Sequence, residues 1–341
     1  MEKRMSENYT QIFSNPQLLL EKIREADELT RRIHGTEVSL QRAIFLSWWC
    51  DKADCKFCYM STQKEKIPEP VKARRKLARI YAEAEVCRAL NFDIEFLSGG
   101  YGSFSIEEIK SIAERICVIT SKPTWLNIGV LNKKELKIFG KEVEGIVGAV
   151  ETINDKIRIE LCPSKPLKPI EKMLKEAKDL GFKTGMTIIL GLGEKVHDLP
   201  RLFSFIRKND VDRIIYYSLN PHKGTPLKDY PSPASLYQAG VIALTRVEFP
   251  EIEIIGGTWI DQLSNIGIML LAGANGITKY PFLAMFGNRY GRKLEEEVKF
   301  AGRKLKGTFT DMTRLENLKT NDEEINKEIK KYLKQLSSDA E

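Results

Sequence analysis

The sequence predicts an α/β fold, a complete (β/α)8 TIM-type barrel in one domain. From residue 43 onward, eight apolar runs of strand length alternate with amphipathic helical stretches, as in βα units on a parallel sheet. Proline and glycine fall mostly between these elements, and no Gly/Ser-rich linker divides the chain. The 341 residues, 42% of them hydrophobic, suffice for one large core. We therefore expect a barrel over residues 41–313, with its site at the carboxyl ends of the strands.

The expected strands are short apolar runs, whereas several of the helical stretches place apolar residues at positions i, i+3 and i+4. In chain order, the expected strands are 43–49, 93–97, 124–129, 145–150, 184–190, 213–218, 252–256 and 276–280. The expected helices between them include 71–90, 106–116, 167–180, 199–208 and 234–247.

Both ends of the chain are expected to lie outside the barrel. Residues 1–40 contain two helical patterns, at 15–23 and 26–33, and predict an N-terminal helical extension. Residues 314–341 are dense in Lys, Glu, Asp and Asn, with few apolar residues. This composition predicts a polar C-terminal tail, a surface helix that frays into disorder.

Charge and composition narrow the possible functions. The net charge is +7, but the basic residues are interspersed with acids, and no basic patch interleaved with aromatic residues suggests a nucleic-acid partner. No apolar run approaches the roughly 18 residues of a membrane span, so we expect no membrane association. The six cysteines are sparse and follow no apolar signal peptide. They favour a reducing cytoplasm over a disulfide framework.

The most informative feature is a group of three cysteines within nine residues, Cys50, Cys55 and Cys58. Four thiolates would close a zinc site or saturate a cubane, whereas three on a [4Fe-4S] cluster leave one iron open to a small ligand. The alternative is a zinc site with its fourth ligand from a histidine or from Cys87, Cys117 or Cys162. No second CxxC or HxxxH pair supports such a site, so we expect a reactive cluster and three structural cysteines.

The cysteine spacing resembles that of radical S-adenosylmethionine (SAM) enzymes. That family carries CxxxCxxC on the loop after the first barrel strand, and this chain has CxxxxCxxC after the apolar run 43–49. Phe57 matches the aromatic residue that precedes the third cysteine in the family. The resemblance implies an enzyme that uses a [4Fe-4S] cluster and SAM. It also implies that Cys50, Cys55 and Cys58 are the cluster ligands and catalytic residues, with Phe57 beside the cofactor.

The second expected strand ends in small residues that resemble the GGE stretch, which in that family holds the SAM amino group. Here Ser98, Gly99 and Gly100 would let SAM approach the backbone, and Tyr101 stands in place of the usual acid. A plain tight turn is the other interpretation of the glycine pair.

Residues 150–154 resemble the ET-x-N segment of one branch of the family, which contains biotin synthase, hydrogenase maturases and methylornithine synthase. In that branch the glutamate, here Glu151, meets SAM. A lone glutamate near a helix start can also be a helix cap. In the same branch a basic residue often faces the SAM carboxylate. It would fall near Ile170 here, so either Lys168 or Lys172 takes its place or the contact is absent.

The fifth expected strand continues into a stretch, residues 187–194, that resembles the GxIxGxxE motif of the same branch. This resemblance implies that Ile189, Gly191 and Glu194 flank the adenine of SAM. Two later segments extend the likeness to about residue 310, because residues 218–227 resemble its NxxPxxGTPL loop and residues 271–277 its LAGAN strand entry.

The chain lacks, at the matching places, the further cysteines and the arginine that biotin synthase needs for its second cluster, and its lengthened cysteine spacing is a sharper clue. A longer first gap, usually of five residues where this chain has four, is known from the radical SAM protein group that builds the pyridinol of the iron-guanylylpyridinol cofactor of Fe-hydrogenase. The resemblance therefore implies a step in the biosynthesis of that cofactor. Another hydrogenase maturase, or a mutase similar to methylornithine synthase, remains the alternative within the family.

The resemblance also implies a small-molecule substrate and a one-electron donor protein. Side chains at the other strand ends are substrate candidates by position: Asn127, Tyr216, Ser218, Asn220, His222, Thr258, Trp259, Lys279 and Tyr280. An imidazole titrates near neutrality, so His222 is the best acid–base candidate, although a hydrogen-bonded loop histidine fits equally well. The alternative of another class is a non-catalytic zinc or iron–sulfur carrier or scaffold, which needs no SAM pocket.

Overall fold

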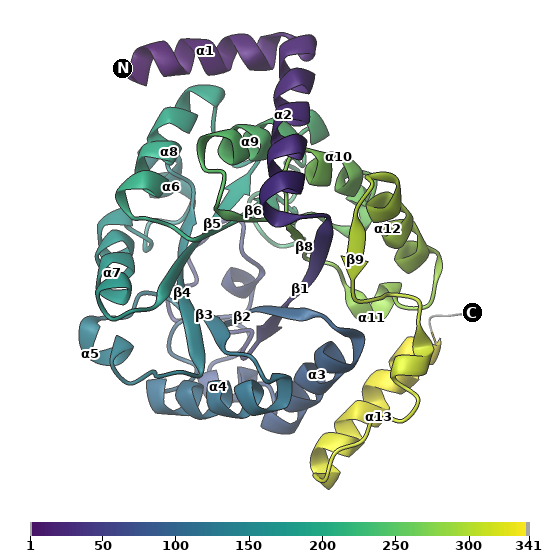
Figure 1. The fold of residues 1–341 in the computed structure, drawn as a ribbon. Coiled ribbons are helices and arrows are strands. Elements are labelled where there is room, and N and C mark those ends of the chain that lie inside the picture. The colour runs from purple at the N-terminus through teal and green to yellow at the C-terminus, as the bar shows by residue number, and fades with distance from the viewer. Residues whose placement is uncertain (1, 339–341) are drawn as a thin grey trace.

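The computed structural model describes residues 2–338 and forms a closed barrel of eight parallel strands (Figure 1). Strands β2 to β8 follow one another around the barrel, and β1 closes it by pairing with β8 and β2. A short ninth strand pairs with the start of β1. The expected fold class is confirmed. The strands are β1 (Glu37–Phe45), β2 (Asp93–Ser98), β3 (Thr124–Asn127), β4 (Val143–Glu151), β5 (Lys183–Leu190), β6 (Arg213–Ser218), β7 (Glu253–Gly257), β8 (Gly276–Thr278) and β9 (Lys304–Lys306).

Helices surround the barrel on its outside (Figure 1). One of them, α4, begins at a capping box, in which the Ser105 hydroxyl accepts from the Glu108 N–H and the Glu108 carboxylate accepts from the Ser105 N–H. No helix between residues 2 and 338 is long and apolar enough to cross a membrane. The helices after β1 are α3 (Leu77–Leu90), α4 (Ile106–Thr120), α5 (Lys133–Leu136), α6 (Asp155–Leu161), α7 (Leu167–Asp179), α8 (Leu199–Lys208), α9 (Ser235–Glu248), α10 (Asn265–Leu271), α11 (Phe282–Met285), α12 (Arg289–Phe300) and α13 (Glu323–Ser338).

Side chains of the strands divide between two layers, because successive residues of a strand point to opposite faces. The barrel interior holds a small apolar cluster that includes Phe96, Trp125, Tyr217 and Ile255. A much larger core fills the space between the strands and the helices. Seven of the eight expected strands have both ends within two residues of the observed ones. The apolar runs therefore located the barrel well.

The first strand is the exception, because β1 spans residues 37–45 rather than 43–49. Its middle carries Gln41 and Arg42, and these polar residues obscure the strand in an apolar pattern. In the structure the Arg42 guanidinium reaches the Glu83 carboxylate on α3, with 2.7 Å between Nε and Oε1. The apolar residues after position 45 leave the sheet and begin the loop that carries the three cysteines.

The N-terminal extension also differs from the expectation. The patterns at 15–23 and 26–33 belong to one continuous helix, α2 (Pro16–His34), and a further helix, α1 (Glu2–Ser14), precedes it. The Asn15 side chain caps α2 by accepting from the Gln17 N–H at 3.0 Å. Helix α2 packs against α9, where a Cβ added at Gly240 would lie 2.8 Å from the Leu19 side chain of α2 and 2.7 Å from the Phe13 ring of α1. This close approach ties the extension to the barrel.

The C-terminal tail is more ordered than expected. Residues 339–341 lie outside the described part of the chain, but α13 forms a complete helix beside α3 (Figure 1). Its Ile325, Ile329, Tyr332 and Leu336 are buried. The Arg79 guanidinium of α3 lies 3.3 Å from the centre of the Tyr332 ring, a cation–π contact. Four apolar residues at helical spacing were enough to dock a helix that is otherwise polar.

Glu83 links α3 to both β1 and α13. Its carboxylate is 1% exposed and accepts from Arg42, from Arg75 and from the Tyr332 hydroxyl. Burial alone would raise the pKa of Glu83, but the charges of Arg42 and Arg75 lower it from 4.5 to about 2. The ion pairs of Glu83 with Arg42 and Arg75 therefore stabilise the folded protein fully above pH 4.5. This contribution is lost as the pH falls toward 2.

Replacing Glu83 with glutamine tests this ion pair. We expect Glu83→Gln to lower the free energy of unfolding at pH 7 by about 3–5 kcal/mol, because two arginines lose their buried partner. The deficit relative to the wild type should shrink at pH 3, where the wild-type carboxylate begins to protonate. Urea denaturation at both pH values measures the difference. Glu114→Gln, on the exposed face of α4, is the control, and an equal deficit at the two pH values would contradict the assignment.

Candidate active site

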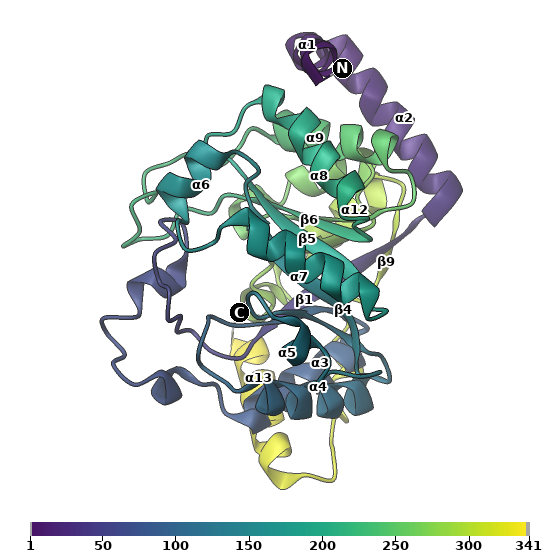
Figure 2. The same ribbon diagram turned by 90° about the vertical axis from the view of Figure 1, so that its left-hand side faces the viewer.

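One large cavity opens at the carboxyl ends of the barrel strands. Its volume is about 610 Å³, and both apolar and polar side chains line it. The long loop that follows β1 borders this end of the barrel and extends to one side of it (Figure 2). The lining residues at or near the strand ends include Phe45, Ser98, Asn127, Glu151, Ile189, Ser218 and Lys279.

All three cysteines of the motif line this cavity. Backbone hydrogen bonds fix their loop, because the Cys58 N–H donates to the Cys55 carbonyl at 3.0 Å and the Lys56 N–H donates to the Leu161 carbonyl at 2.8 Å. Asp54 adds a side-chain tie, since its carboxylate accepts from both the N–H and the hydroxyl of Ser164. The thiols are therefore held by the β1 loop and by the loop after α6.

The thiols lie in a buried environment. Burial raises the pKa of Cys55 and of Cys58, and the positive charge of Lys165 acts against this effect in both cases. Between residues 2 and 338, no three Cys, His, Asp or Glu side chains converge tightly enough to hold a single metal ion. Cys162 is fully buried in the apolar cluster that contains Cys55 and Phe57, but it does not line the cavity.

The glycine pair after β2 lies directly against the cysteine loop. A Cβ added at Gly100 would lie 2.0 Å from the Trp49 carbonyl oxygen and 2.4 Å from Cys50 Cβ. At Gly99 the same atom would have room, with its nearest neighbour at 3.9 Å. A residue without a side chain is therefore required at position 100, where the loop after β2 packs against the backbone of Trp49 and Cys50. The Tyr101 carbonyl completes the contact by accepting from the Asp51 N–H at 3.0 Å.

Glu151 ends β4 and forms a buried ion pair with Lys165, with 2.6 Å between Nζ and Oε1. The other carboxylate oxygen accepts from the Thr187 hydroxyl at 3.2 Å. The backbone of Glu151 is in the left-handed region (φ 60°), which a residue other than glycine rarely adopts. Burial alone would lower the pKa of Lys165, but the Glu151 charge raises it well above the ordinary value. Both side chains line the cavity.

Three of the expected cofactor contacts lie elsewhere. Lys172 is on the solvent face of α7, where its side chain is 76% exposed and its ammonium lies 4.0 Å from the Glu176 carboxylate. Gly191 and Glu194 do not line the cavity. They form the turn after β5, in which Gly191 has φ 100° and its N–H donates to the Glu194 carboxylate at 2.8 Å. Ile189, in contrast, does line the cavity.

Two substrate candidates also point away from the cavity. Tyr216 is fully buried between β6 and α9, where its hydroxyl is 2.7 Å from that of Thr245. Its neighbour Tyr217 faces the cavity instead, as the alternation of side chains along a strand requires. Thr258 is buried as well, and its hydroxyl donates to the Gln262 side chain at 2.9 Å. The other expected candidates line the cavity: Asn127, Ser218, Asn220, His222, Trp259, Lys279 and Tyr280.

Two residues near the site were not expected from the sequence. Lys165 lies between two prolines after α6, and the buried Glu151 was the only hint that a cation must lie nearby. Glu95 points into the barrel because the register of β1 and β2 shifts between Ile94 and Phe96, a β-bulge. Its carboxylate accepts from the hydroxyls of Tyr217 and Thr278. A strand pattern alone gives no sign of this bulge.

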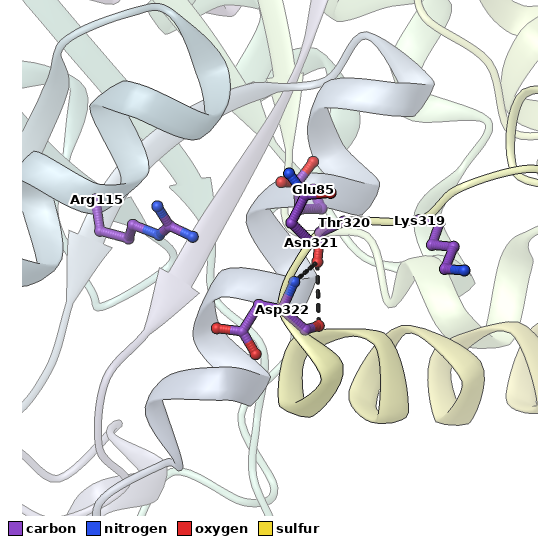
Figure 3. A pocket seen from close by; sticks show the side chains of 6 residues that line it. All are labelled: Glu85, Arg115, Lys319, Thr320, Asn321 and Asp322. Carbon is purple, nitrogen blue, oxygen red and sulfur yellow. Dashed lines mark hydrogen bonds between the residues drawn. The ribbon is translucent and has the colours of Figure 1, made fainter.

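A second pocket lies on the outer surface, between α3, α4 and the segment before α13 (Figure 3). It is open, and charged or polar side chains line it: Glu85, Arg115, Lys319, Thr320, Asn321 and Asp322. Within it, the Thr320 hydroxyl donates to the Asp322 carbonyl at 3.2 Å and accepts from the Asp322 N–H at 3.1 Å. None of its lining residues borders the cavity with the thiols.

The chain is similar in sequence or fold to several known proteins. Residues 46–206, which include the cysteine loop and β2 to β5, match the model of the radical SAM superfamily. The chain is 43% identical over 295 residues to the protein MJ0597 of Methanocaldococcus jannaschii, covering 86% of this chain and 82% of that one. It is 25% identical over 260 residues to 3-methylornithine synthase of Methanosarcina acetivorans, covering 74% and 72%. The crystal structure of methylornithine synthase has the same fold, with a TM-score of 0.72, 17% identity, and coverage of 88% and 93%.

The matches establish the class of enzyme to which this parallel barrel, with three thiols of one loop lining its cavity, belongs. The chain belongs to the radical SAM superfamily. Enzymes of this superfamily use a [4Fe-4S] cluster and SAM. The residues present fit both groups, because soft thiols from one loop share a cavity with a paired carboxylate and ammonium.

Proposed function

We propose that Cys50, Cys55 and Cys58 hold three irons of a [4Fe-4S] cluster, and that the fourth iron is open to SAM. The observation that carries this proposal is the arrangement of the three thiols along one cavity that also contains Glu151 and Lys165. Three cysteine ligands leave one iron without a protein ligand. The same cavity then offers space for SAM next to the cluster.

The charges beside the thiols support a site for the amino acid part of SAM. SAM carries an ammonium and a carboxylate on one carbon, and Glu151 and Lys165 present the two complementary charges 2.6 Å apart. Lys165 therefore takes the role first expected of Lys172. The Ser98–Gly100 backbone and the Phe57, Tyr101 and Ile189 side chains line the space around them. Gly191 and Glu194 contribute indirectly, by shaping the turn after β5.

When bound together, the reduced cluster and SAM supply a 5'-deoxyadenosyl radical. The residues of the chain enclose the site in which that radical acts. Phe45, Phe96 and Tyr217 form apolar walls that exclude water and stray hydrogen donors. Side chains at the strand ends hold a small molecule in one orientation, so that one of its hydrogens faces the reagent. An enzyme of this class takes its electron from a donor, and we propose that the donor is a separate protein.

Within the superfamily, we infer a role in the biosynthesis of the pyridinol of the Fe-hydrogenase iron-guanylylpyridinol cofactor. The CxxxxCxxC spacing supports this role, because a lengthened first gap is the feature that the chain shares with that group. The second candidate is a carbon-skeleton mutase. The similarity to 3-methylornithine synthase over 74% of the chain favours it. The reconstituted enzyme can be incubated with SAM and cell extract, and the products analysed. Formation of a pyridinol supports the first role, and a rearranged carbon skeleton supports the mutase.

Anaerobic reconstitution with iron and sulfide tests the proposed cluster and its cleavage of SAM. We expect the dithionite-reduced protein to give a [4Fe-4S] electron paramagnetic resonance signal that changes when SAM is added, together with 5'-deoxyadenosine in the same sample. Cys55→Ala should lose both. Cys162→Ala, which removes a buried thiol outside the cavity, should keep both. A signal that ignores SAM in the wild type would refute the proposal and leave a zinc or carrier role.

A further inference from the structure

Lys279 is a cation of the cavity that, within the described residues 2–338, forms neither a salt bridge nor a hydrogen bond through its ammonium. It follows β8, and its ammonium lies 4.7 Å from the centre of the Tyr217 ring and 5.1 Å from that of Phe45. The other two cations that line the cavity are paired, Arg42 with Glu83 and Lys165 with Glu151. Within residues 2–338, no carboxylate forms a salt bridge with Lys279 and no group accepts a hydrogen bond from its ammonium. A charge in this position costs free energy until an anion pairs with it.

The backbone of Lys279 is also unusual. Its φ of 74° is in the left-handed region, which costs free energy for a residue other than glycine or asparagine. Such strain persists where the surrounding structure imposes it, and it concentrates at ligand sites. Burial lowers the pKa of Lys279, consistent with an ammonium removed from bulk water.

The carboxylate of Glu95, whose negative charge acts on Lys279, already has two hydrogen-bond donors. Glu95 accepts from the Tyr217 hydroxyl with one oxygen and from the Thr278 hydroxyl with the other, the second at 2.6 Å. These bonds hold the Tyr217 ring in place, so that its face is presented to Lys279. Glu95 therefore supports the floor of the site and leaves the ammonium of Lys279 available to a ligand.

Aromatic rings extend from Lys279 along the cavity wall. Phe45 stacks on Trp48 with 4.6 Å between ring centres, Trp48 meets Tyr59 at 6.1 Å, and the series continues through His222 to Trp259. All of these rings line the cavity, yet Trp48 is 41% exposed and Tyr59 is 43% exposed. Burial and the charge of Lys279 lower the pKa of His222, so this imidazole adds no positive charge at pH 7. Adjacent exposed rings of this kind suit a planar, apolar ligand body.

We propose that the substrate is an organic carboxylate with a planar apolar body. Its carboxylate pairs with Lys279, and its body packs along the aromatic wall formed by Phe45, Trp48, Tyr59, His222 and Trp259. This inference rests on the proposed function, because it names the class of molecule on which the enclosed reagent acts. It places the substrate on the side of the cavity formed by the ends of β6, β7, β8 and β1, and SAM on the β4 side with Glu151 and Lys165.

The test compares probes of one shape and different charge. Benzoate, benzamide and benzylamine are titrated by calorimetry into the reconstituted protein with SAM present, and acetate tests the need for the ring. We expect benzoate to bind more tightly than benzamide by a factor on the order of 10, and more tightly than acetate. Lys279→Met should remove the preference of benzoate over benzamide, and Lys279→Arg should restore most of it.

Lys223→Met is the matched control, because it removes an exposed positive charge from the loop next to His222 without changing the cavity. It should keep the wild-type preference. Equal affinity for benzoate and benzamide in the wild type, a preference that survives Lys279→Met, or stronger binding of benzylamine would each overturn the inference. Failure of the proposed function itself would be visible separately, as a wild-type cluster that does not respond to SAM. Thermal unfolding of each variant shows whether it is folded.

Discussion

A Gly100→Ala variant is expected to lose most of its cluster and to form 5'-deoxyadenosine on the order of 100-fold more slowly than the wild type. The added methyl group has no space, because it would lie 2.0 Å from the Trp49 carbonyl oxygen and 2.5 Å from Cys50 Cα. Both of these neighbours are backbone atoms, so rotation of a flexible side chain cannot relieve the clash. The loop with Cys50 must move instead, and one cluster ligand moves with it.

Gly99→Ala is the matched control for this prediction. Its added Cβ would lie 3.9 Å from the Leu46 side chain, an ordinary van der Waals contact. After the same reconstitution, the iron and sulfide content of Gly99→Ala should equal that of the wild type, whereas that of Gly100→Ala should fall sharply. Equal loading of the two variants would show that the contact between Gly100 and the cysteine loop does not position the cluster ligands.

The second large effect is expected for Lys165→Met. Removing the ammonium leaves the Glu151 carboxylate without its cation, although Glu151 is only 7% exposed to solvent. The free energy of unfolding should fall by about 3–5 kcal/mol, the usual penalty for an uncompensated buried charge. Chemical denaturation at pH 7 measures it. Binding of SAM, measured by equilibrium dialysis of the reconstituted protein, should weaken as well.

A double variant separates the cost of the unpaired charge from other effects of Lys165→Met. In Lys165→Met/Glu151→Gln both charges are absent, so most of the lost stability should return while SAM binding stays weak. Lys168→Met, on the exposed start of α7, should match the wild type in both measurements. A double variant no more stable than Lys165→Met would indicate that Lys165 acts through packing rather than through its charge.

The sequence predicted the bounds of the barrel strands and helices better than it predicted which side chains face the barrel interior. Strand β6 and helix α8 begin and end where the apolar pattern places them. The same pattern could not decide which of Tyr216 and Tyr217 faces inward, because every residue of β6 is buried and the strand shows no polar alternation. The phase of the strand is set by pairing with β5 and β7, which a local pattern does not contain.

The cofactor site shows the same limit. The cysteine motif and Glu151 are recognisable because their chemistry is carried by a short stretch of chain. The partner of Glu151 is not, since Lys165 reaches it only through the fold of α6 and the loop that follows. Lys172, seven residues further on in α7, lies nearer in the sequence to the position that the resemblance suggested, but its side chain faces solvent. Contacts between loops depend on the path of the chain in space, and residue spacing does not record that path.

The contact between α13 and α3 has a practical consequence for anyone who expresses this protein. Tyr332 shares Glu83 with Arg75 and Arg42, and Arg42 belongs to the strand that leads into the cysteine loop. Cutting the gene before α13 would therefore uncover this ion pair to solvent, although the deleted segment lies far along the chain from the thiols. Crystallisation trials that trim polar ends should keep α13, and affinity tags belong on a spacer beyond it.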